Sequence, residues 1–220
     1  MAQSMTPIAR PILWSFRRCP YAMRARMAVL SAGLEVELRE IKLKEKPKAF
    51  LRASASATVP NLQAGDLNLD ESLDIMLWAL GQSDPNGLLN MPDMGHTLIA
   101  QNDGPFKAAL DHTKYATRYP DLDPQIERSK ASEFIQSLNS RLTETSFLMG
   151  DRPTLADIAI FPFMRQFAHI DRAWFDAQPW PKVILWLDGF LQSPDFQTIM
   201  TKIPVWDDGA SPYIFGHYFE

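Results

Sequence analysis

The pattern of hydrophobic and polar residues changes character near residue 81. Before that point, an apolar and β-prone run at 11–16 precedes helical spacing at 20–32, and apolar and charged residues then alternate over 35–43. A short helix at 47–52, two brief strands at VPNL and LNL, and an amphipathic helix from about 70 to 80 follow. This βαβα–ββα order predicts an α/β domain over residues 1–80.

The second part of the chain has a different pattern. Residues 81–93 are rich in Gly, Pro and Asn and predict a linker. Beyond them, hydrophobic residues recur at helical spacing in stretches separated by prolines, without a strand pair or a repeat. Helices are expected near 94–119, 124–145, 154–170, 180–191 and 195–201. We therefore predict an all-α domain over residues 94–220, in which Thr154 and Asp157 form a capping box with a structural role.

Composition and charge argue against several classes of binding partner. The 220 residues, of which 46% are hydrophobic, are enough to bury a core. The net charge of −4 divides into +3 for residues 1–80 (11 basic, 8 acidic) and −7 for residues 81–220 (11 basic, 18 acidic), which argues against a nucleic-acid partner. No apolar run is long enough to span a membrane and no signal peptide is expected, so no membrane partner is predicted. No metal is expected, because the four histidines are scattered: His96, His112, His169 and His217.

The only cysteine, Cys19, lies between a predicted strand and a predicted helix. As the N-cap residue, with Pro20 at the first helical position, it would face backbone N–H groups and the positive end of the helix dipole. Arg17 and Arg18 add positive charge, and such surroundings lower the pKa of a thiol from about 8.5 to roughly 3.5–7.5. The alternative is a buried, inert cysteine. One cysteine cannot form an internal disulfide, which predicts a reducing, cytoplasmic location.

Three other stretches suggest a ligand. A cis Val59–Pro60 bond would leave the backbone of Val59 to pair with an extended peptide, the alternative being an ordinary edge-strand proline. Glu71 and Ser72 begin a helix, where they cap it or bind an α-amino-acid group. Lys46 is either a solvated lysine or the partner of a second carboxylate. A ligand with a thiol, a peptide backbone, an α-amino-acid end and a second carboxylate would satisfy all four features, and glutathione is such a molecule.

The chain resembles the cytosolic-type glutathione transferases and is most similar to the omega class, whose characteristic residue is cysteine instead of tyrosine or serine. The resemblance rests on RRCPYAMRARMAVLSAGL, IKLKEKPKAF, TVPNL and DESLDI, and later on PTLADIAIFPFMR and WPKVILWLDGF. It implies a thioredoxin-like, glutathione-binding βαβ–ββα domain at 1–80 and an all-helical glutathione-transferase-type domain at 94–220 that forms the second-substrate pocket. A homodimer is usual in this family, although the related two-domain glutaredoxins show that a monomer is compatible with the architecture.

The resemblance also implies roles for individual residues. Cys19 would form a mixed disulfide with glutathione, Lys46 would face its glycyl carboxylate, and Val59 would pair with its backbone. The implied glutathione contacts are Tyr21, Lys46, Val59, Pro60, Glu71 and Ser72. The implied second-substrate residues are Tyr115, Arg165, Trp174 and Trp206.

Ala22 occupies the position of the second cysteine in dithiol glutaredoxins, so Cys19 has to work through glutathione. The predicted function is a glutathione-dependent thiol transferase or reductase, with dehydroascorbate-reductase-type activity allowed by the resemblance. Its second substrate would be a small electrophilic, disulfide or oxidised compound. Two alternatives remain: a monothiol glutaredoxin-like reductase of protein mixed disulfides, and a non-catalytic protein that binds glutathione or an apolar ligand.

Overall fold

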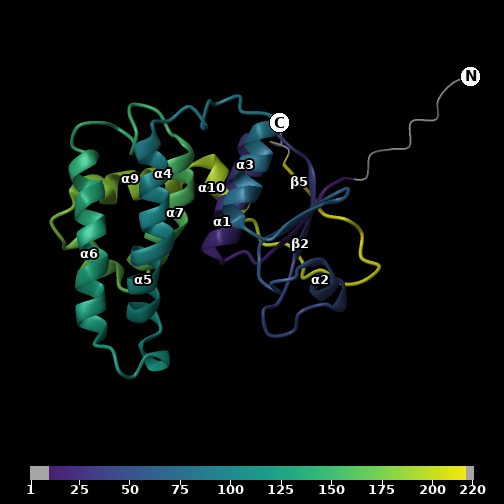
Figure 1. Cartoon of the computed structure of the whole chain (residues 1–220), viewed down its shortest axis with the longest axis horizontal. Coiled ribbons are helices and arrows are strands. Elements are labelled where there is room, and N and C mark those ends of the chain that lie inside the picture. Colours follow the sequence, from purple (N-terminus) through teal and green to yellow (C-terminus); the bar gives the residue numbers. More distant parts are fainter. Residues whose placement is uncertain (1–9, 217–220) are drawn as a thin grey trace, which may run out of the picture. The chain divides into compact units, whose positions relative to one another are not determined.

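Figure 1 shows the computed structural model of the chain, in which residues 10–216 are described. These residues form two compact units. One, here called the sheet unit, combines the chain up to Asn86 with its end from Thr198 onward. The other, the helical unit, comprises Gly87–Gln197. The division between Asn86 and Gly87 falls within the predicted linker at 81–93, whose first two residues belong to a helix that ends at Gln82.

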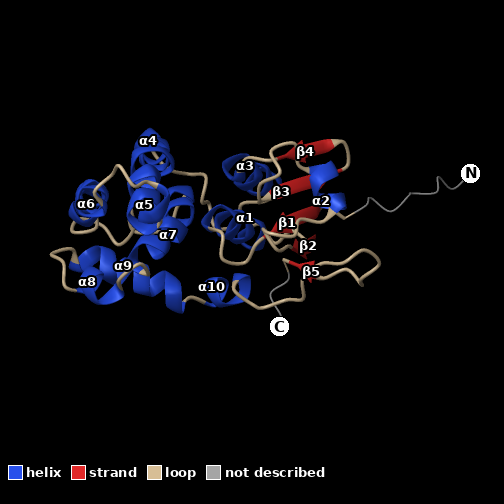
Figure 2. Ribbon diagram, turned by 90° about the horizontal axis from the view of Figure 1, so that it is seen from below, coloured by secondary structure: helices blue, strands red, loops and turns tan. Residues whose placement is uncertain are grey.

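The sheet unit contains a five-stranded sheet in the order β4-β3-β1-β2-β5. β1 and β2 are parallel, and the other neighbouring pairs are antiparallel. Helices α1 and α3 lie on one face of this sheet and α2 on the other (Figure 2). Its elements are β1 (Ile12–Ser15), α1 (Pro20–Ser31), β2 (Val36–Glu40), α2 (Lys48–Ala53), β3 (Asn61–Ala64), β4 (Leu67–Leu69), α3 (Ser72–Gln82) and β5 (Ile214–Phe215). The predicted thioredoxin-like fold is confirmed.

The residue types explain these elements. β1 is central in the sheet, and its apolar residues Leu13 and Trp14 are buried. Helix α1 ends at Gly33, whose φ of +64° is a left-handed conformation that glycine adopts without steric cost and whose N–H bonds to the Leu30 carbonyl at 3.0 Å. On the α2 face of the sheet, Trp14 packs with Phe50 in an apolar cluster. The same cluster is contacted by Cys19, so the core of the unit extends to the predicted reactive residue.

The end of the chain is not helical, so the predicted all-helical domain over 94–220 is wrong for residues 200–216. Ile214 and Phe215 form β5, which pairs with β2, and the Trp206 N–H bonds to the Glu40 carbonyl at 2.7 Å. Without these contacts β2 would be an edge strand with unpaired backbone groups. Gly216 permits this close approach, because a Cβ atom there would lie 1.8 Å from the Leu34 carbonyl oxygen. Residues 217–220, including His217, lie outside the described part.

The helical unit contains α4 (Asp93–Gln101), the π-helical turn η1 (Asn102–Phe106), α5 (Lys107–Lys114), the 3₁₀ turn η2 (Ala116–Arg118), α6 (Pro124–Arg141), α7 (Leu155–Ala168), α8 (Arg172–Asp176), α9 (Pro181–Gln192) and most of α10 (Pro194–Ile199). The helix predicted over 94–119 is confirmed over Asp93–Lys114, where α4, the π-helical turn and α5 follow one another without a break. Pro105, which has no N–H to donate, lies within the π-helical turn, and the helix stops before 119 because its C-cap, Tyr115, has φ −115° and ψ 40°. No helix in residues 10–216 is long and apolar enough to cross a membrane.

The predicted capping box at the start of α7 is confirmed. The fully buried Asp157 carboxylate accepts the backbone N–H and the hydroxyl of Thr154, both at 2.9 Å. It also accepts the Leu148 N–H at 2.9 Å and the Trp186 indole N–H at 3.0 Å. Asp157 therefore joins α7 to α9 and to the preceding loop, and its role is structural.

Candidate active site

Cys19 is the N-cap residue of α1, as the sequence predicts. Its φ of −74° and ψ of 124° are extended, and Pro20 takes the first helical position, where a missing N–H costs nothing. The Cys19 carbonyl accepts the first intrahelical bond, from the Met23 N–H at 2.9 Å, and the Cys19 N–H bonds to the Phe16 carbonyl at 2.9 Å. The backbone thus holds the half-buried thiol at the positive end of the α1 dipole.

Val59 lies beside the thiol. The Cys19 sulfur lies 3.6 Å from the Val59 carbonyl oxygen, within the range of a weak S–H···O bond. The Val59–Pro60 bond is cis, as predicted, and β3 begins only at Asn61. Among residues 10–216, no hydrogen bond uses the Val59 N–H. Both backbone polar groups of Val59 are therefore outside the sheet ladder, and its carbonyl lies beside the thiol.

The start of α3 lies in the same unit and is tied to α1. Glu71 is its exposed N-cap, and the next residue, Ser72, is only 2% exposed. The Ser72 hydroxyl accepts a hydrogen bond of 3.0 Å from the Arg24 guanidinium, which is also 2% exposed. The first intrahelical bond is donated by Ile75, so the earlier N–H groups of α3 point out of the helix end. This end can accept a carboxylate.

Asp70 connects the start of α3 to the loop that carries Val59. Its carboxylate accepts the Ser54 hydroxyl at 2.6 Å, the Ser56 N–H at 3.2 Å and the Asn61 amide at 3.0 Å. Partial burial alone would raise the pKa of Asp70, but these donors outweigh it and lower the pKa. The Val59 segment and Glu71 are thus held together by one ionised carboxylate.

A buried cation contacts the loop that leads into Cys19. Arg26, 1% exposed, donates to the Ser15 hydroxyl at 2.5 Å and to the Arg17 carbonyl at 2.7 Å. Burial lowers the pKa of Arg26 to about 10, while the charges of Glu40 and Cys19 act in the opposite direction. Sequence reasoning missed Arg24 and Arg26. Two arginines within the apolar run MRARMAVL were the available signal.

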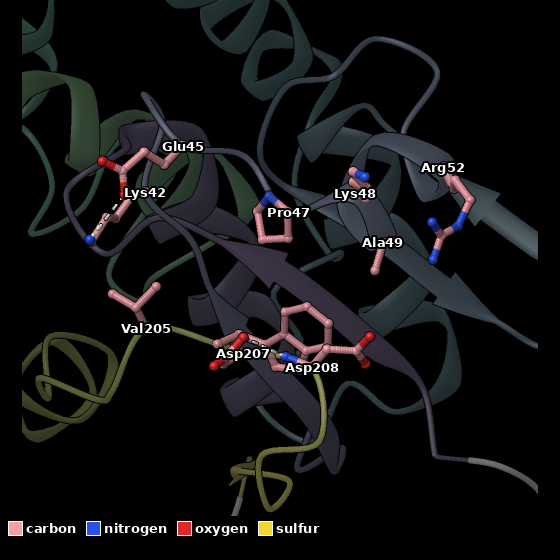
Figure 3. Close-up of a pocket in the computed structure, with 10 residues that line it drawn as sticks. Lys42, Glu45, Pro47, Lys48, Ala49, Arg52, Val205, Asp207 and Asp208 are labelled. Atoms are coloured by element: carbon pink, nitrogen blue, oxygen red, sulfur yellow. Dashed lines mark hydrogen bonds and ion pairs between the residues drawn. The ribbon is translucent and has the colours of Figure 1, made fainter.

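The other two predicted glutathione residues, Tyr21 and Lys46, lie in the same unit. Tyr21 is half-buried, and its ring centroid is 5.2 Å from the Arg24 guanidinium carbon. Lys46 is exposed in the loop before α2. Its two neighbours in the chain, Glu45 and Pro47, line an open cleft of about 440 Å³ between that loop and residues 205–208 (Figure 3). Lys46 itself is not among the residues that line this cleft.

Trp206 lies in the sheet unit, which corrects its expected place in the helical domain. Its ring centroid is 4.9 Å from that of Trp14 and 4.8 Å from the Arg39 guanidinium carbon. The Glu40 carbonyl, which accepts its N–H, fixes its backbone. Trp206 therefore packs on the α2 face of the sheet and also lines the cleft that Glu45 and Pro47 border.

The remaining second-substrate candidates belong to the helical unit. Tyr115 ends α5, and its ring centroid is 4.4 Å from the Arg118 guanidinium carbon. Arg165 of α7 lies 5.5 Å from the ring centroid of Phe196. Trp174 of α8 packs against several aromatic rings of its unit and lies 4.6 Å from the Arg128 guanidinium carbon. Within residues 10–216, no group of three or more His, Cys, Asp or Glu side chains is placed to hold a metal ion.

Comparison with known proteins agrees with this geometry. The family profile "Glutathione S-transferase, N-terminal domain" matches residues 13–87, and "Glutathione S-transferase, C-terminal domain" matches residues 115–189. Glutathione S-transferase omega-1 of Mus musculus is 26% identical over 196 residues, which cover 83% of this chain and 77% of the relative. Glutathione S-transferase 1 of Zea mays is 26% identical over 208 residues, which cover 84% of this chain and 91% of the relative.

Solved structures share the fold. A glutathione transferase family member from Pseudomonas fluorescens, with two glutathione bound, superposes with a TM-score of 0.75 at 19% identity, covering 90% of this chain and 95% of that one. Glutathione S-transferase-I bound with lactoylglutathione gives a TM-score of 0.69 at 24% identity, covering 87% and 99% of the two chains. The two family profiles together match more than half of the sequence. The chain therefore belongs to the glutathione S-transferase family.

Proposed function

We propose that this chain is a glutathione-dependent thiol transferase, similar to the omega class, that works through a mixed disulfide between Cys19 and glutathione. The observation that carries the proposal is the position of the only cysteine. Cys19 caps the N-terminus of α1, and its sulfur lies 3.6 Å from the Val59 carbonyl oxygen. A helix N-terminus favours a thiolate, which is the nucleophile in thiol–disulfide exchange.

The neighbouring groups fit a bound tripeptide. The backbone N–H and C=O of Val59 can pair with the cysteinyl residue of glutathione, since both lie outside the sheet. The Ser72 hydroxyl and the N–H groups at the start of α3 can hold the γ-glutamyl carboxylate, while Glu71 can pair with its ammonium group. Lys46 can reach the glycyl carboxylate, and Tyr21 flanks the site beside Arg24.

The reaction follows from having one thiol. The Cys19 thiolate attacks the glutathionyl sulfur of a substrate disulfide, a new S–S bond forms, and the substrate leaves as a thiolate that takes up a proton. Ala22 offers no second thiol to resolve this intermediate. The thiolate of a second glutathione therefore attacks the glutathionyl sulfur, which releases oxidised glutathione and regenerates the Cys19 thiolate.

The second substrate is a small disulfide, an oxidised compound or an electrophile. Tyr115, Arg165, Trp174 and Trp206 remain candidates for binding it. Conjugation to electrophiles should be slow, because it needs a hydroxyl donor that keeps the sulfur of glutathione as a free thiolate. The site has a cysteine instead, which holds that sulfur as a mixed disulfide once an oxidised substrate has supplied it. We further propose a cytoplasmic location. We also propose a homodimer, and the elution volume in size-exclusion chromatography would check this oligomeric state.

The decisive experiment is intact-protein mass spectrometry after incubation with oxidised glutathione. We expect an adduct of about 305 Da, one glutathionyl group, that maps to Cys19 and is removed by reduced glutathione. Cys19→Ser should give no adduct. Ala22→Cys is the matched variant that gains a second thiol. This thiol should attack the mixed disulfide and convert it into an internal disulfide, so the protein should be about 2 Da (two hydrogens) lighter than its dithiol form.

The alternatives give different results in the same experiment. Absence of the adduct with retained glutathione binding would replace the enzyme by a non-catalytic binding protein. If the adduct forms, rates with a small glutathionylated disulfide and with a glutathionylated protein decide between a small-molecule thiol transferase and a glutaredoxin-like reductase.

A further inference from the structure

We propose that Arg26 and Glu40 act as opposed positioning charges that set the thiolate fraction of Cys19, Arg26 increasing it and Glu40 decreasing it. The inference deepens the proposed function, because it concerns the group that would attack the disulfide. It rests on the contacts of both side chains with the loop that leads into Cys19.

The side chains of Arg26 and Glu40 both bond to the backbone of Arg17. Arg17 lies two residues before Cys19, and its N–H bonds to the Glu40 carboxylate at 2.8 Å. Its carbonyl accepts the Arg26 guanidinium at 2.7 Å. The two side chains come from different elements, Arg26 from α1 and Glu40 from the end of β2. The two charged side chains therefore hold Arg17, and with it the loop that leads into Cys19, from both sides.

The hydrogen bonds of Arg26 satisfy only part of its guanidinium group and do not neutralise its charge. It lies two helical turns after Cys19 on α1, and the only groups to which it donates among residues 10–216 are the Ser15 hydroxyl and the Arg17 carbonyl. Its Nε is buried and has no hydrogen-bond partner in this part of the chain. Both acceptors are uncharged, so the positive charge is not neutralised by direct contact. Because its pKa is about 10, Arg26 stays protonated at neutral pH.

Glu40 provides the opposite charge. It is partly buried, and burial raises its pKa above the ordinary value, an effect that the Arg17 N–H and the charges of Arg26, Arg17 and Arg18 reduce but do not cancel. Charges act over longer distances in a protein interior than in water, because the effective dielectric constant is lower. The thiol therefore experiences Arg26, Arg17 and Arg18 as favouring the thiolate and Glu40 as disfavouring it.

The two charges predict shifts of opposite sign. Arg26→Gln removes the cation, so the pKa of the Cys19 thiol should rise by about one unit, which is about a tenfold loss of thiolate below the midpoint. Glu40→Gln keeps an oxygen that can accept the Arg17 N–H, and it should lower the same pKa. Arg26→Lys keeps the charge and should restore most of the wild-type midpoint. A purely structural role would not produce this pattern.

The test is the rate of iodoacetamide alkylation of Cys19 as a function of pH, without glutathione. Arg10→Gln and Glu35→Gln are matched controls, because they remove one charge each from an exposed ion pair in the same unit, and they should leave the midpoint unchanged. Circular dichroism and thermal unfolding establish that each variant is folded. If Arg26→Gln does not fold, Glu40→Gln alone decides, and a midpoint that is unchanged or raised in that variant overturns the proposal.

Two further outcomes are informative. Shifts of the same sign in Arg26→Gln and Glu40→Gln, or no shift in either, also overturn the proposal. Since alkylation requires no glutathione, opposite shifts without a glutathionyl adduct would uphold these positioning charges while rejecting the proposed transferase. A glutathionyl adduct that forms equally fast in all variants would uphold the proposed transferase and reject the positioning charges.

Discussion

The buried guanidinium of Arg24 donates a hydrogen bond of 3.0 Å to the hydroxyl of Ser72. Arg24 lies on α1, which Cys19 caps, and Ser72 is the first residue of α3. The two helices pack side by side on one face of the sheet (Figure 2). One hydrogen bond therefore couples the helix end that presents the thiol to the helix end that is proposed to hold the γ-glutamyl group.

Replacing Ser72 by alanine tests this coupling. Ser72→Ala leaves the buried Arg24 donor without this acceptor and should lower the free energy of unfolding by about 1–3 kcal/mol in urea denaturation. It also removes a proposed glutathione contact, so the KM for glutathione should rise roughly fivefold, as expected for about 1 kcal/mol. Ser129→Ala is the control, since this exposed residue of α6 donates its hydroxyl to the Gln125 carbonyl at 3.0 Å. An unchanged KM in Ser72→Ala would remove Ser72 from the glutathione site.

Asp70 should affect both stability and binding. Asp70→Asn replaces an ionised carboxylate that accepts three donors, so the free energy of unfolding should fall by about 1 kcal/mol, a value reduced for its partial exposure. The loop carrying Val59 then loses part of its tie to the start of α3, and the KM for glutathione should rise. Asp74→Asn, an exposed change in the first turn of α3, is the control. Equal KM values for wild type and Asp70→Asn would contradict the role of this carboxylate.

The sequence predicts the parts of the fold that depend on local pattern. Strand and helix spacing before residue 81 was sufficient because each element repeats its hydrophobic period over several residues. β5 has only two residues and pairs with β2 far away in the sequence, so no local period could indicate it. The π-helical turn was missed for a related reason, since a helical pattern continues through it while Pro105 alters the backbone.

The same distinction applies to the site. Cys19 and the Val59–Pro60 bond were identified because their neighbours in the chain define them, as a helix cap and as a residue before proline. Arg24, Arg26 and Asp70 act through partners on other elements, which one sequence does not reveal. Trp206 shows the limit of extrapolation from a helical pattern, because the segment that carries it returns to the sheet unit.

Asp157 should be essential for the stability of the helical unit. In Asp157→Asn, an amide nitrogen replaces one carboxylate oxygen and faces either the two donors of Thr154 or those of Leu148 and Trp186. Each buried donor left without an acceptor costs about 1–3 kcal/mol, so urea denaturation should show a loss of at least about 2 kcal/mol. Asp151→Asn, an exposed change near the same helix, should have almost no effect. A small loss in Asp157→Asn would show that the carboxylate is replaceable by a neutral acceptor.

Glu127 should make the stability of the protein depend on acid pH. This carboxylate of α6 accepts hydrogen bonds from Lys130 at 2.6 Å and from His112 of α5 at 2.8 Å, and these two partners lower its pKa. Because the folded-state pKa lies below the ordinary value of 4.5, Glu127 stabilises the fold fully above that value. This contribution is lost as the pH falls through the lowered pKa.

The measurement is the urea midpoint of wild type and Glu127→Gln from about pH 6 to about pH 3. At the upper end the variant should be less stable than wild type, and the difference should shrink as the pH falls, because wild type protonates the carboxylate that the variant lacks. Glu133→Gln, an exposed change on the same helix, should run parallel to wild type over the whole range. A difference between Glu127→Gln and wild type that stays constant with pH would mean that Glu127 acts through packing and not through its charge.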